Sequence, residues 1–345
     1  MNNGLNKNNK NTFESNEVRI GITSPGPDWI EGDSENLYFQ KNRVDYVLRF
    51  WQTGTLATTT LNSVAFGNGL FVAVGSGGEI STASASDEFP FLWATQNSGV
   101  FNTFSSVAFG NNLWAAGGSS GQLVTSTDAI TWTTQTSTFG TTTINMVAFG
   151  GGLWVAVGPT GQIRTSTDAI TWTTRDGFFG TANILSLKFN NGLWVAGSSG
   201  GQLRTSTDGV SWVTQTSQFG TTNITSIEFG NGLWVAAGWS GTLRTSTDAI
   251  TWTTRDTGFT TNLTVAPFAN RMWVVWSGGA TKTSTDTITW TTGPLRTNGL
   301  SSIISVDRNW LGVGFNGENA MSVSTFFPSI NVGNSFKIFK TWYKK

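Results

Sequence analysis

A repeat of about forty residues constrains the fold of this chain more than any other feature. The phrase TSTDAITWTT occurs identically at 125–134, 165–174 and 245–254, with close variants at 205–214 and 283–292. A second phrase, of the general form VAFGNGLWVAVG, alternates with the first. Because a fixed period means that one small structural unit recurs, the fold is expected to be an array of such units.

Two series of aromatic residues count the units. The series in the second phrase comprises Phe71, Trp114, Trp154, Trp194, Trp234, Trp273 and Trp310. The other series comprises Trp51, Trp93, Trp132, Trp172, Trp212, Trp252 and Trp290. Thirteen of the 17 tryptophans therefore recur at regular spacing, and the count indicates seven units.

Each unit has the pattern of four short strands. Residues 224–229 alternate apolar and polar side chains, and the Gly-Asn-Gly sequence at 230–232 predicts a tight turn. Further strands are predicted at 233–237, 243–246 and 250–254. The abundant Thr, Val and Gly disfavour helices.

This pattern predicts an all-β chain, a seven-bladed β-propeller of four-stranded antiparallel blades. The blades are expected at about 64–93, 107–132, 147–172, 187–212, 227–252, 265–290 and 303–325. The last unit lacks the TSTDAITWTT phrase, because Ser324 is followed by Thr-Phe-Phe-Pro. We therefore predict that an N-terminal strand, Tyr46–Trp51, completes this blade and closes the ring, which removes two open sheet edges. The C-terminal segment Phe336–Trp342 is a rival for the same position.

The predicted propeller covers 46–325, and the two ends differ from it. Residues 1–45 are polar and rich in asparagine, as in a tail or an anchor. Within them, residues 35–40 match the recognition sequence of a plant-virus protease used to remove engineered tags. Residues 326–345 form an extension with four lysines and no acidic residue.

Composition excludes several classes of function. Without cysteine or histidine, the chain has no disulfide, thiol nucleophile, Ser-His-Asp triad or histidine-ligated metal, and we expect no cofactor. The net charge of zero gives no general attraction to nucleic acid or anionic lipid. The apolar runs are too short to insert into a membrane, and the start of the chain lacks the apolar stretch of a secretory signal.

The repeated sequence TSTDAITWTT and its variants resemble the Asp-box of sialidase-type (BNR) repeat propellers. The matching residues are Ser126, Asp128 and Trp132; Ser166, Asp168 and Trp172; Ser206, Asp208 and Trp212; Ser246, Asp248 and Trp252; and Ser284, Asp286 and Trp290. The resemblance implies that each box joins the third and fourth strands of a blade, on the face opposite the functional mouth. Side-chain hydrogen bonds within a turn account for Ser and Asp, with calcium binding as an alternative.

The resemblance also raises a sialidase-like glycoside hydrolase, which the sequence disfavours. Sialidases use a tyrosine nucleophile paired with a glutamate, and an arginine triad. Here Tyr38, Tyr46 and Tyr343 lie outside the six blades that are complete in sequence. We therefore expect no enzymatic activity and assign no catalytic residue.

A loop tryptophan is the strongest candidate for a ligand contact. Trp239 lies between predicted strands where the other units have Ser76, Ser119, Pro159, Ser199, Gly278 or Phe315, and it either contacts a ligand or covers its own blade. The loops expected on the same face contain Arg175, Asp176, Arg255, Asp256, Gln135 and Gln215. These six residues form either a polar rim around a ligand or ordinary solvated loops.

Repeated charges allow two interpretations. Arg164, Arg204, Arg244 and Lys282 share one strand position, and they either bind an anionic glycan or phosphate or lie over apolar surface. Lys188 and Glu228 occupy matched positions on neighbouring innermost strands and are expected to form an ion pair.

The sequence thus favours a non-catalytic binding or structural propeller. Near-identical repeats are common in phage tail and large-virus proteins, so we expect a virion or extracellular surface module that recognises a glycan or protein receptor. Because the repeats also resemble the assembly propellers of photosystem II, an intracellular scaffold for assembly proteins is the alternative, and a cytoplasmic location stays open.

Overall fold

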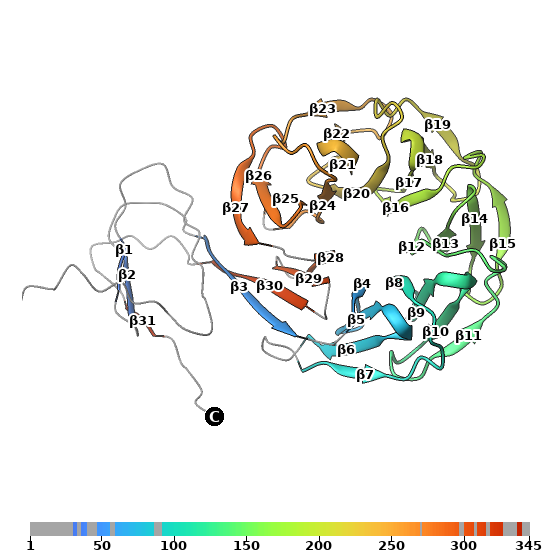
Figure 1. Cartoon of the computed structure of the whole chain (residues 1–345), viewed down its shortest axis with the longest axis horizontal. Coiled ribbons are helices and arrows are strands. Elements are labelled where there is room, and N and C mark those ends of the chain that lie inside the picture. The colour runs from blue at the N-terminus through green and yellow to red at the C-terminus, as the bar shows by residue number, and fades with distance from the viewer. Residues whose placement is uncertain are drawn as a thin grey trace, which may run out of the picture.

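The computed structural model describes residues 30–32, 36–39, 47–55, 59–85, 92–269, 271–296, 300–306, 309–314, 318–326 and 337–339. Seven four-stranded antiparallel sheets and one three-stranded sheet make up these residues. The four-stranded sheets are arranged around a central axis, with the first strand innermost and the fourth strand outermost (Figure 1). The predicted all-β architecture of four-stranded antiparallel propeller blades is confirmed.

Six blades each consist of four consecutive strands. Blade 1 contains β4 (Leu61–Gly67), β5 (Leu70–Gly75), β6 (Ile80–Ser84) and β7 (Ala94–Gln96). Blade 2 contains β8 (Phe104–Gly110), β9 (Leu113–Gly118), β10 (Leu123–Ser126) and β11 (Thr133–Gln135). Blade 3 contains β12 (Met146–Gly150), β13 (Leu153–Val157), β14 (Gln162–Ser166) and β15 (Thr173–Asp176). Blade 4 contains β16 (Ile184–Asn190), β17 (Leu193–Ser198), β18 (Leu203–Ser206) and β19 (Val213–Gln215). Blade 5 contains β20 (Ile224–Gly230), β21 (Leu233–Gly238), β22 (Leu243–Ser246) and β23 (Thr253–Arg255). Blade 6 contains β24 (Thr264–Val265), β25 (Trp273–Ser277), β26 (Ala280–Ser284) and β27 (Thr291–Arg296).

The remaining four-stranded sheet combines the two ends of the repeat region. Its order is β28 (Leu300–Val306), β29 (Asn309–Gly314), β30 (Glu318–Phe326) and β3 (Val47–Thr55). Strand β3 pairs antiparallel with β30, so the N-terminal segment predicted to be a strand lies at the outer edge of this sheet.

The rival C-terminal segment lies in a different sheet. Strand β31 (Lys337–Phe339) pairs with β2 (Asn36–Phe39), and β2 pairs with β1 (Ile30–Gly32). The proposed protease site at 35–40 overlaps β2. Apart from β1, β2, β31 and Phe326 of β30, the predicted tail and extension lie outside the described residues.

The fourth strand begins later than the sequence predicts. In blade 5 we expected it at 250–254, but β23 starts at Thr253. The reason is the box turn: Asp248 Oδ1 accepts hydrogen bonds from the backbone N–H groups of Ile250 and Thr251, each at 2.8 Å. These bonds fold the start of the expected strand into a turn, and pairing begins after Trp252.

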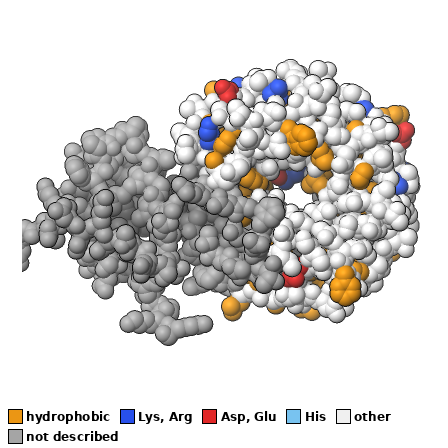
Figure 2. Space-filling model, viewed as in Figure 1, with side chains coloured by type: hydrophobic (Ala, Val, Ile, Leu, Met, Phe, Trp, Pro, Cys, Tyr) orange, Lys and Arg blue, Asp and Glu red, His pale blue; other side chains and the backbone are white. Residues whose placement is uncertain are grey.

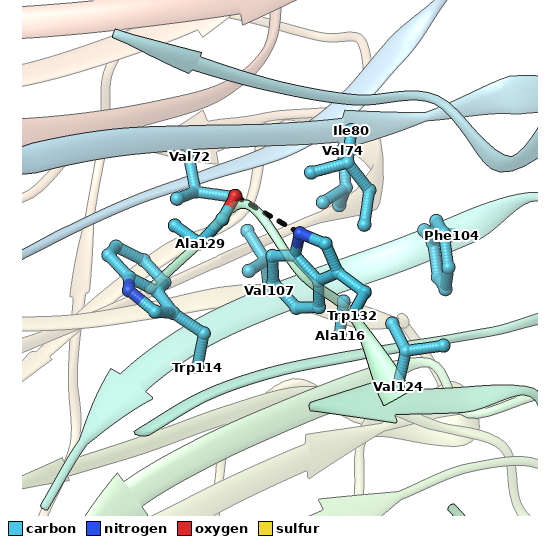
Figure 3. Close-up of a cluster of buried hydrophobic side chains, with 10 residues drawn as sticks. All are labelled: Val72, Val74, Ile80, Phe104, Val107, Trp114, Ala116, Val124, Ala129 and Trp132. Carbon is cyan, nitrogen blue, oxygen red and sulfur yellow. Dashed lines mark hydrogen bonds between the residues drawn. The ribbon is translucent and has the colours of Figure 1, made fainter. Parts of the chain in front are cut away.

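The core lies between neighbouring blades. In the cluster of Figure 3, Val72, Val74 and Ile80 of blade 1 pack against Phe104 and Trp114 of blade 2. The second-strand tryptophans of blades 2 to 5 are at most 1 % exposed. Because each apolar sheet face is covered by the next blade, the repeat must be stacked to be stable.

Candidate functional site

The turns between the third and fourth strands, here called the boxes, lie on one face of the ring, here called the box face, at residues 126–132, 166–172, 206–212, 246–252 and 284–290. In the first box, Ser126 Oγ donates to Asp128 Oδ1 at 2.9 Å, and that oxygen accepts the N–H groups of Ile130 and Thr131. Trp132 Nε1 donates to the carbonyl of Ala129 at 3.1 Å. The other four boxes repeat these bonds, which agrees with a structural role for the motif.

The turn hydrogen bonds change the acidity of the box aspartates. Backbone N–H donors lower the pKa of Asp128, Asp208 and Asp286 to about 2, and they also lower that of Asp168 and Asp248. These carboxylates are therefore fixed as anions that accept hydrogen bonds. Within the described residues, no three acidic side chains lie close enough together to hold a metal ion.

The opposite face, here called the loop face, is built from two kinds of loop. Loops between the second and third strands include η1 (Ser76–Gly78), η2 (Ser119–Gly121), η3 (Ser199–Gly201) and η4 (Trp239–Gly241). Connections between blades lie beside them: Ser217 Oγ donates to the Gly201 carbonyl at 2.5 Å, and Gly241 N donates to the Thr261 carbonyl at 2.7 Å. The antiparallel strand order places both kinds of loop away from the boxes.

Trp239 is an exposed aromatic on the loop face. Its side chain is 48 % exposed, although its backbone N–H donates to the Asn223 carbonyl at 3.2 Å and its carbonyl accepts from Thr242 Oγ1 at 2.8 Å. The matched residues of other blades are Ser76, Ser119, Pro159 and Ser199. A rigid loop thus holds a large amphipathic ring where the repeat has small residues.

Four of the predicted site residues make equivalent hydrogen bonds, one in each of four blades. Each reaches from the fourth strand to a threonine on the third strand of its own blade, at 2.8–2.9 Å. The pairs are Gln135 with Thr125, Arg175 with Thr165, Gln215 with Thr205 and Arg255 with Thr245. This bond explains why either Arg or Gln fits the position, since both supply an N–H donor. A ligand-binding role for these residues stays a prediction.

The two predicted aspartates cap turns on the loop face. Asp176 Oδ1 accepts the Phe178 N–H at 2.8 Å, and Asp256 Oδ1 accepts the Gly258 N–H at 2.7 Å. The connection that follows Asp256 also bonds to η4 through Gly241. The structure therefore brings Asp256 and Trp239 onto adjoining loops, whereas Asp176 lies at the end of blade 3.

The repeated cations lie over aromatic rings, as the second of the two interpretations predicted. Arg164, Arg204, Arg244 and Lys282 sit 4.8–5.1 Å from the ring centroids of Phe139, Phe179, Phe219 and Phe259, respectively. Each stack joins one blade to the connection from the preceding blade. Burial lowers the pKa of Arg164, Arg204 and Arg244 below its ordinary value.

The predicted ion pair of the innermost strands is confirmed. Lys188 Nζ lies 2.6 Å from Glu228 Oε2, on β16 and β20. Burial raises the pKa of Glu228, and Lys188 offsets part of that increase. The pair joins two blades near the axis, where Figure 2 shows an opening through the ring.

Sequence reasoning did not identify two exposed aromatics in the connections between blades: Phe101, which is 91 % exposed, and Phe178. The side chain of Phe178 is 64 % exposed, next to the buried Phe179. In the sequence Phe178 and Phe179 look like one apolar pair. Alignment of the blade connections would have separated them, because the matched positions hold Thr138, Gln218 and Gly258. On the face drawn in Figure 2, hydrophobic side chains form separate small groups around the ring.

Comparison with known proteins supports the architecture. No family model and no curated protein sequence matches this chain. A solved structure described as YCF48 bound to D1 peptide is 16 % identical, covers 80 % of this chain and 95 % of its own, and has a TM-score of 0.65. YCF48 from Cyanidioschyzon merolae is 18 % identical, with coverage of 79 % and 98 % and a TM-score of 0.62.

The WD40 propeller domain of Doa1 is 11 % identical, with coverage of 79 % and 97 % and a TM-score of 0.65. In the described part of this chain, no helix is long and apolar enough to cross a membrane. At these identities the likeness concerns the fold, and the chain has the fold of a β-propeller.

Proposed function

We propose that this chain is a non-catalytic propeller that binds a polypeptide segment on its loop face, with Trp239 as the main contact. The exposed indole of Trp239 carries the proposal, because it replaces a small residue of the repeat on a loop held by backbone hydrogen bonds. Tryptophan, with tyrosine and arginine, is enriched among the residues that dominate binding energy. The peptide in the YCF48 complex supports a polypeptide as the class of partner.

The same exposed surface is also compatible with other classes of ligand. An exposed indole also stacks on sugar rings, so a glycan receptor on a virion or extracellular surface is the second candidate. An intracellular scaffold for assembly proteins would use the same face for a polypeptide. The site geometry supports binding rather than chemistry, since the loop-face carboxylates Asp176 and Asp256 accept backbone N–H groups of their own turns.

A parallel screen separates the two ligand classes. The whole protein is tested against a random dodecapeptide library on phage and against a glycan array. We expect selected peptides to bind the native protein. Trp239→Ser is expected to lower the affinity for these peptides by about 30-fold or more, the size expected for a dominant contact. Glycan binding without peptide binding would contradict the proposal.

A matched control lies on the opposite face of the same blade. Ile250 is 53 % exposed in the box of blade 5. The Ile250→Ser variant removes a comparable exposed apolar side chain and is expected to leave peptide affinity unchanged. Equal losses in both variants would indicate non-specific adhesion of the peptide.

We also propose that the composite sheet is the seventh blade and closes the ring. In blades 1, 2 and 5, a serine of the innermost strand accepts the N–H of a valine in the next blade: Val107 N donates to Ser63 Oγ, Val147 N to Ser106 Oγ and Val265 N to Ser226 Oγ, at 3.0–3.2 Å. The same bond, Val64 N to Ser302 Oγ at 3.3 Å, joins the composite sheet to blade 1.

Apolar contacts support closure on both sides of the composite sheet. Leu311 and Val313 of β29 pack in one cluster with Leu61 of blade 1. Toward blade 6, Trp310 Nε1 donates to the Pro267 carbonyl at 2.8 Å. A closed ring would hold the loops of all blades in fixed relative positions, which a binding face requires.

A further inference from the structure

Phe178 has a backbone conformation that bulky side chains rarely adopt. Its φ is 56°, and it is the one aromatic with positive φ among the residues that the structure describes. In the left-handed region the Cβ of an L-residue crowds its own backbone, so a large side chain there is strained. The ring projects into solvent, with 64 % of the side chain exposed.

Neighbouring side chains form hydrogen bonds with both the backbone N–H and the backbone carbonyl of Phe178. The Phe178 N–H donates to Asp176 Oδ1, and the Phe178 carbonyl accepts a hydrogen bond from Arg204 Nη2. Arg204 is itself fixed, because its guanidinium lies 4.9 Å from the ring centroid of Phe179. Strain of this kind persists where the surroundings over-determine the backbone.

The same frame recurs in other connections without an aromatic. The matched residues Gly99, Thr138, Gln218 and Gly258 have φ values of 71°, 60°, 58° and 68°. The carbonyls of Thr138 and Gln218 accept hydrogen bonds from Arg164 and Arg244, as that of Phe178 does from Arg204. The turn therefore forms with glycine or a polar residue, and the phenyl ring is not needed to build it.

The loops carrying Phe178 and Trp239 belong to one hydrogen-bonded row. Ser199 N of η3 donates to the carbonyl of Asn183, at the end of the Phe178 connection. Gly200 N of η3 donates to Asn223 Oδ1 at 3.1 Å, and the Asn223 carbonyl accepts the Trp239 N–H. Phe178 and Trp239 thus lie on one hydrogen-bonded strip of the loop face, over blades 3 to 5.

We propose that Phe178 is a second, preorganised anchor of the peptide-binding face. The inference rests on the proposed function and deepens it: the partner is a polypeptide that presents two apolar side chains, one to Trp239 and one to Phe178. A backbone held in one conformation before binding loses little conformational freedom on contact, which favours affinity. On this proposal, the backbone strain at Phe178 is the energetic cost of a contact residue with a fixed backbone.

The test uses the opposite effects that the proposal predicts on stability and binding. Phe178→Gly relieves the left-handed strain and is expected to raise the melting temperature by about 2 °C. The same variant is expected to lower the affinity for the library-selected dodecapeptides by about tenfold or more, the order expected for an anchoring aromatic. Phe178→Trp is expected to retain their binding.

Ser120→Gly is the matched control, since Ser120 has a φ of 56° in η2 of blade 2, outside the strip, and the matched loops hold Gly77 and Gly200. It is expected to raise stability and leave peptide affinity unchanged. Unchanged affinity in Phe178→Gly together with weakened binding in Trp239→Ser overturns this inference and leaves the proposed function standing. A melting temperature that falls in Phe178→Gly but not in the matched glycine control also overturns it, because the ring would then contribute to packing. A library that yields no peptide contradicts both proposals.

Discussion

Different side chains can make the same hydrogen bond in this repeat. Gln135 and Arg175 occupy matched positions on the fourth strands of blades 2 and 3, and each donates to a threonine on the third strand. The donor geometry is what the blade requires, since both side chains place an N–H group at the same reach. A recurring charged residue in a repeat is therefore weak evidence for a ligand.

Exchange of the two donors tests this account at the scale of one residue. Arg175→Gln is expected to keep the bond to Thr165, so that the melting temperature and peptide affinity match those of the native chain. Arg175→Ala removes the donor and is expected to cost about 1 kcal/mol of unfolding free energy. Thermal unfolding of both variants measures the difference. A loss of peptide affinity in Arg175→Gln would instead give Arg175 a ligand contact.

The box turn is the element that connects the last two strands of a blade. Its carboxylate accepts two backbone N–H groups and a serine hydroxyl, and its tryptophan closes the turn by donating to a carbonyl. The pKa of Asp208 is lowered to about 2, so the folded chain binds its proton less tightly than the unfolded chain does. The stabilisation is complete above the ordinary value of 3.8 and is lost as the pH falls toward about 2.

Acid unfolding tests the role of the box carboxylates. Between pH 3.8 and about 2 the melting temperature of the native chain is expected to fall. Asp208→Asn is expected to be less stable at neutral pH and to lose less stability over that interval, because one of the titrating groups is absent. Melting curves over a pH series give both quantities. If the melting temperature of Asp208→Asn fell over this pH interval as much as that of the native chain, the turn would not be the source of the lowered pKa.

The strands of each blade could be predicted from the sequence because alternation and Gly-rich turns are local signals. Strand β22 agrees with the expected third strand of blade 5 at both ends, whereas β23 starts three residues after the expected position. That difference arises because Asp248 forms hydrogen bonds that alternation does not reveal. Trp239 could be identified because it departs from the repeat, but Phe178 is hidden beside a core phenylalanine, and its exposure depends on a backbone turn.

At the scale of the whole molecule, the proposed closure depends on an N-terminal strand. Strand β3 pairs with β30 over nine residue pairs, the longest register among the seven four-stranded sheets. A strand added from the other end of the chain would remove the open edges of the ring and join its first and last blades.

Two truncations test this closure. Removal of residues 1–55 deletes β3, and we expect a lower melting temperature and a broadened transition. Removal of residues 1–46 leaves β3 in place and is expected to unfold as the full chain does. Calorimetry of the two truncated proteins gives the comparison. Identical melting of both would show that the ring does not depend on this strand.

Hydrogen exchange of the complex with a selected dodecapeptide tests the central claim most directly, because it reports which face is covered. The account predicts slower exchange on peptide binding at 239–242 and in the connections 177–183 and 216–223, with unchanged exchange in the boxes 206–212 and 246–252. Protection confined to the boxes, or no change in the loops, would contradict a binding site on the loop face.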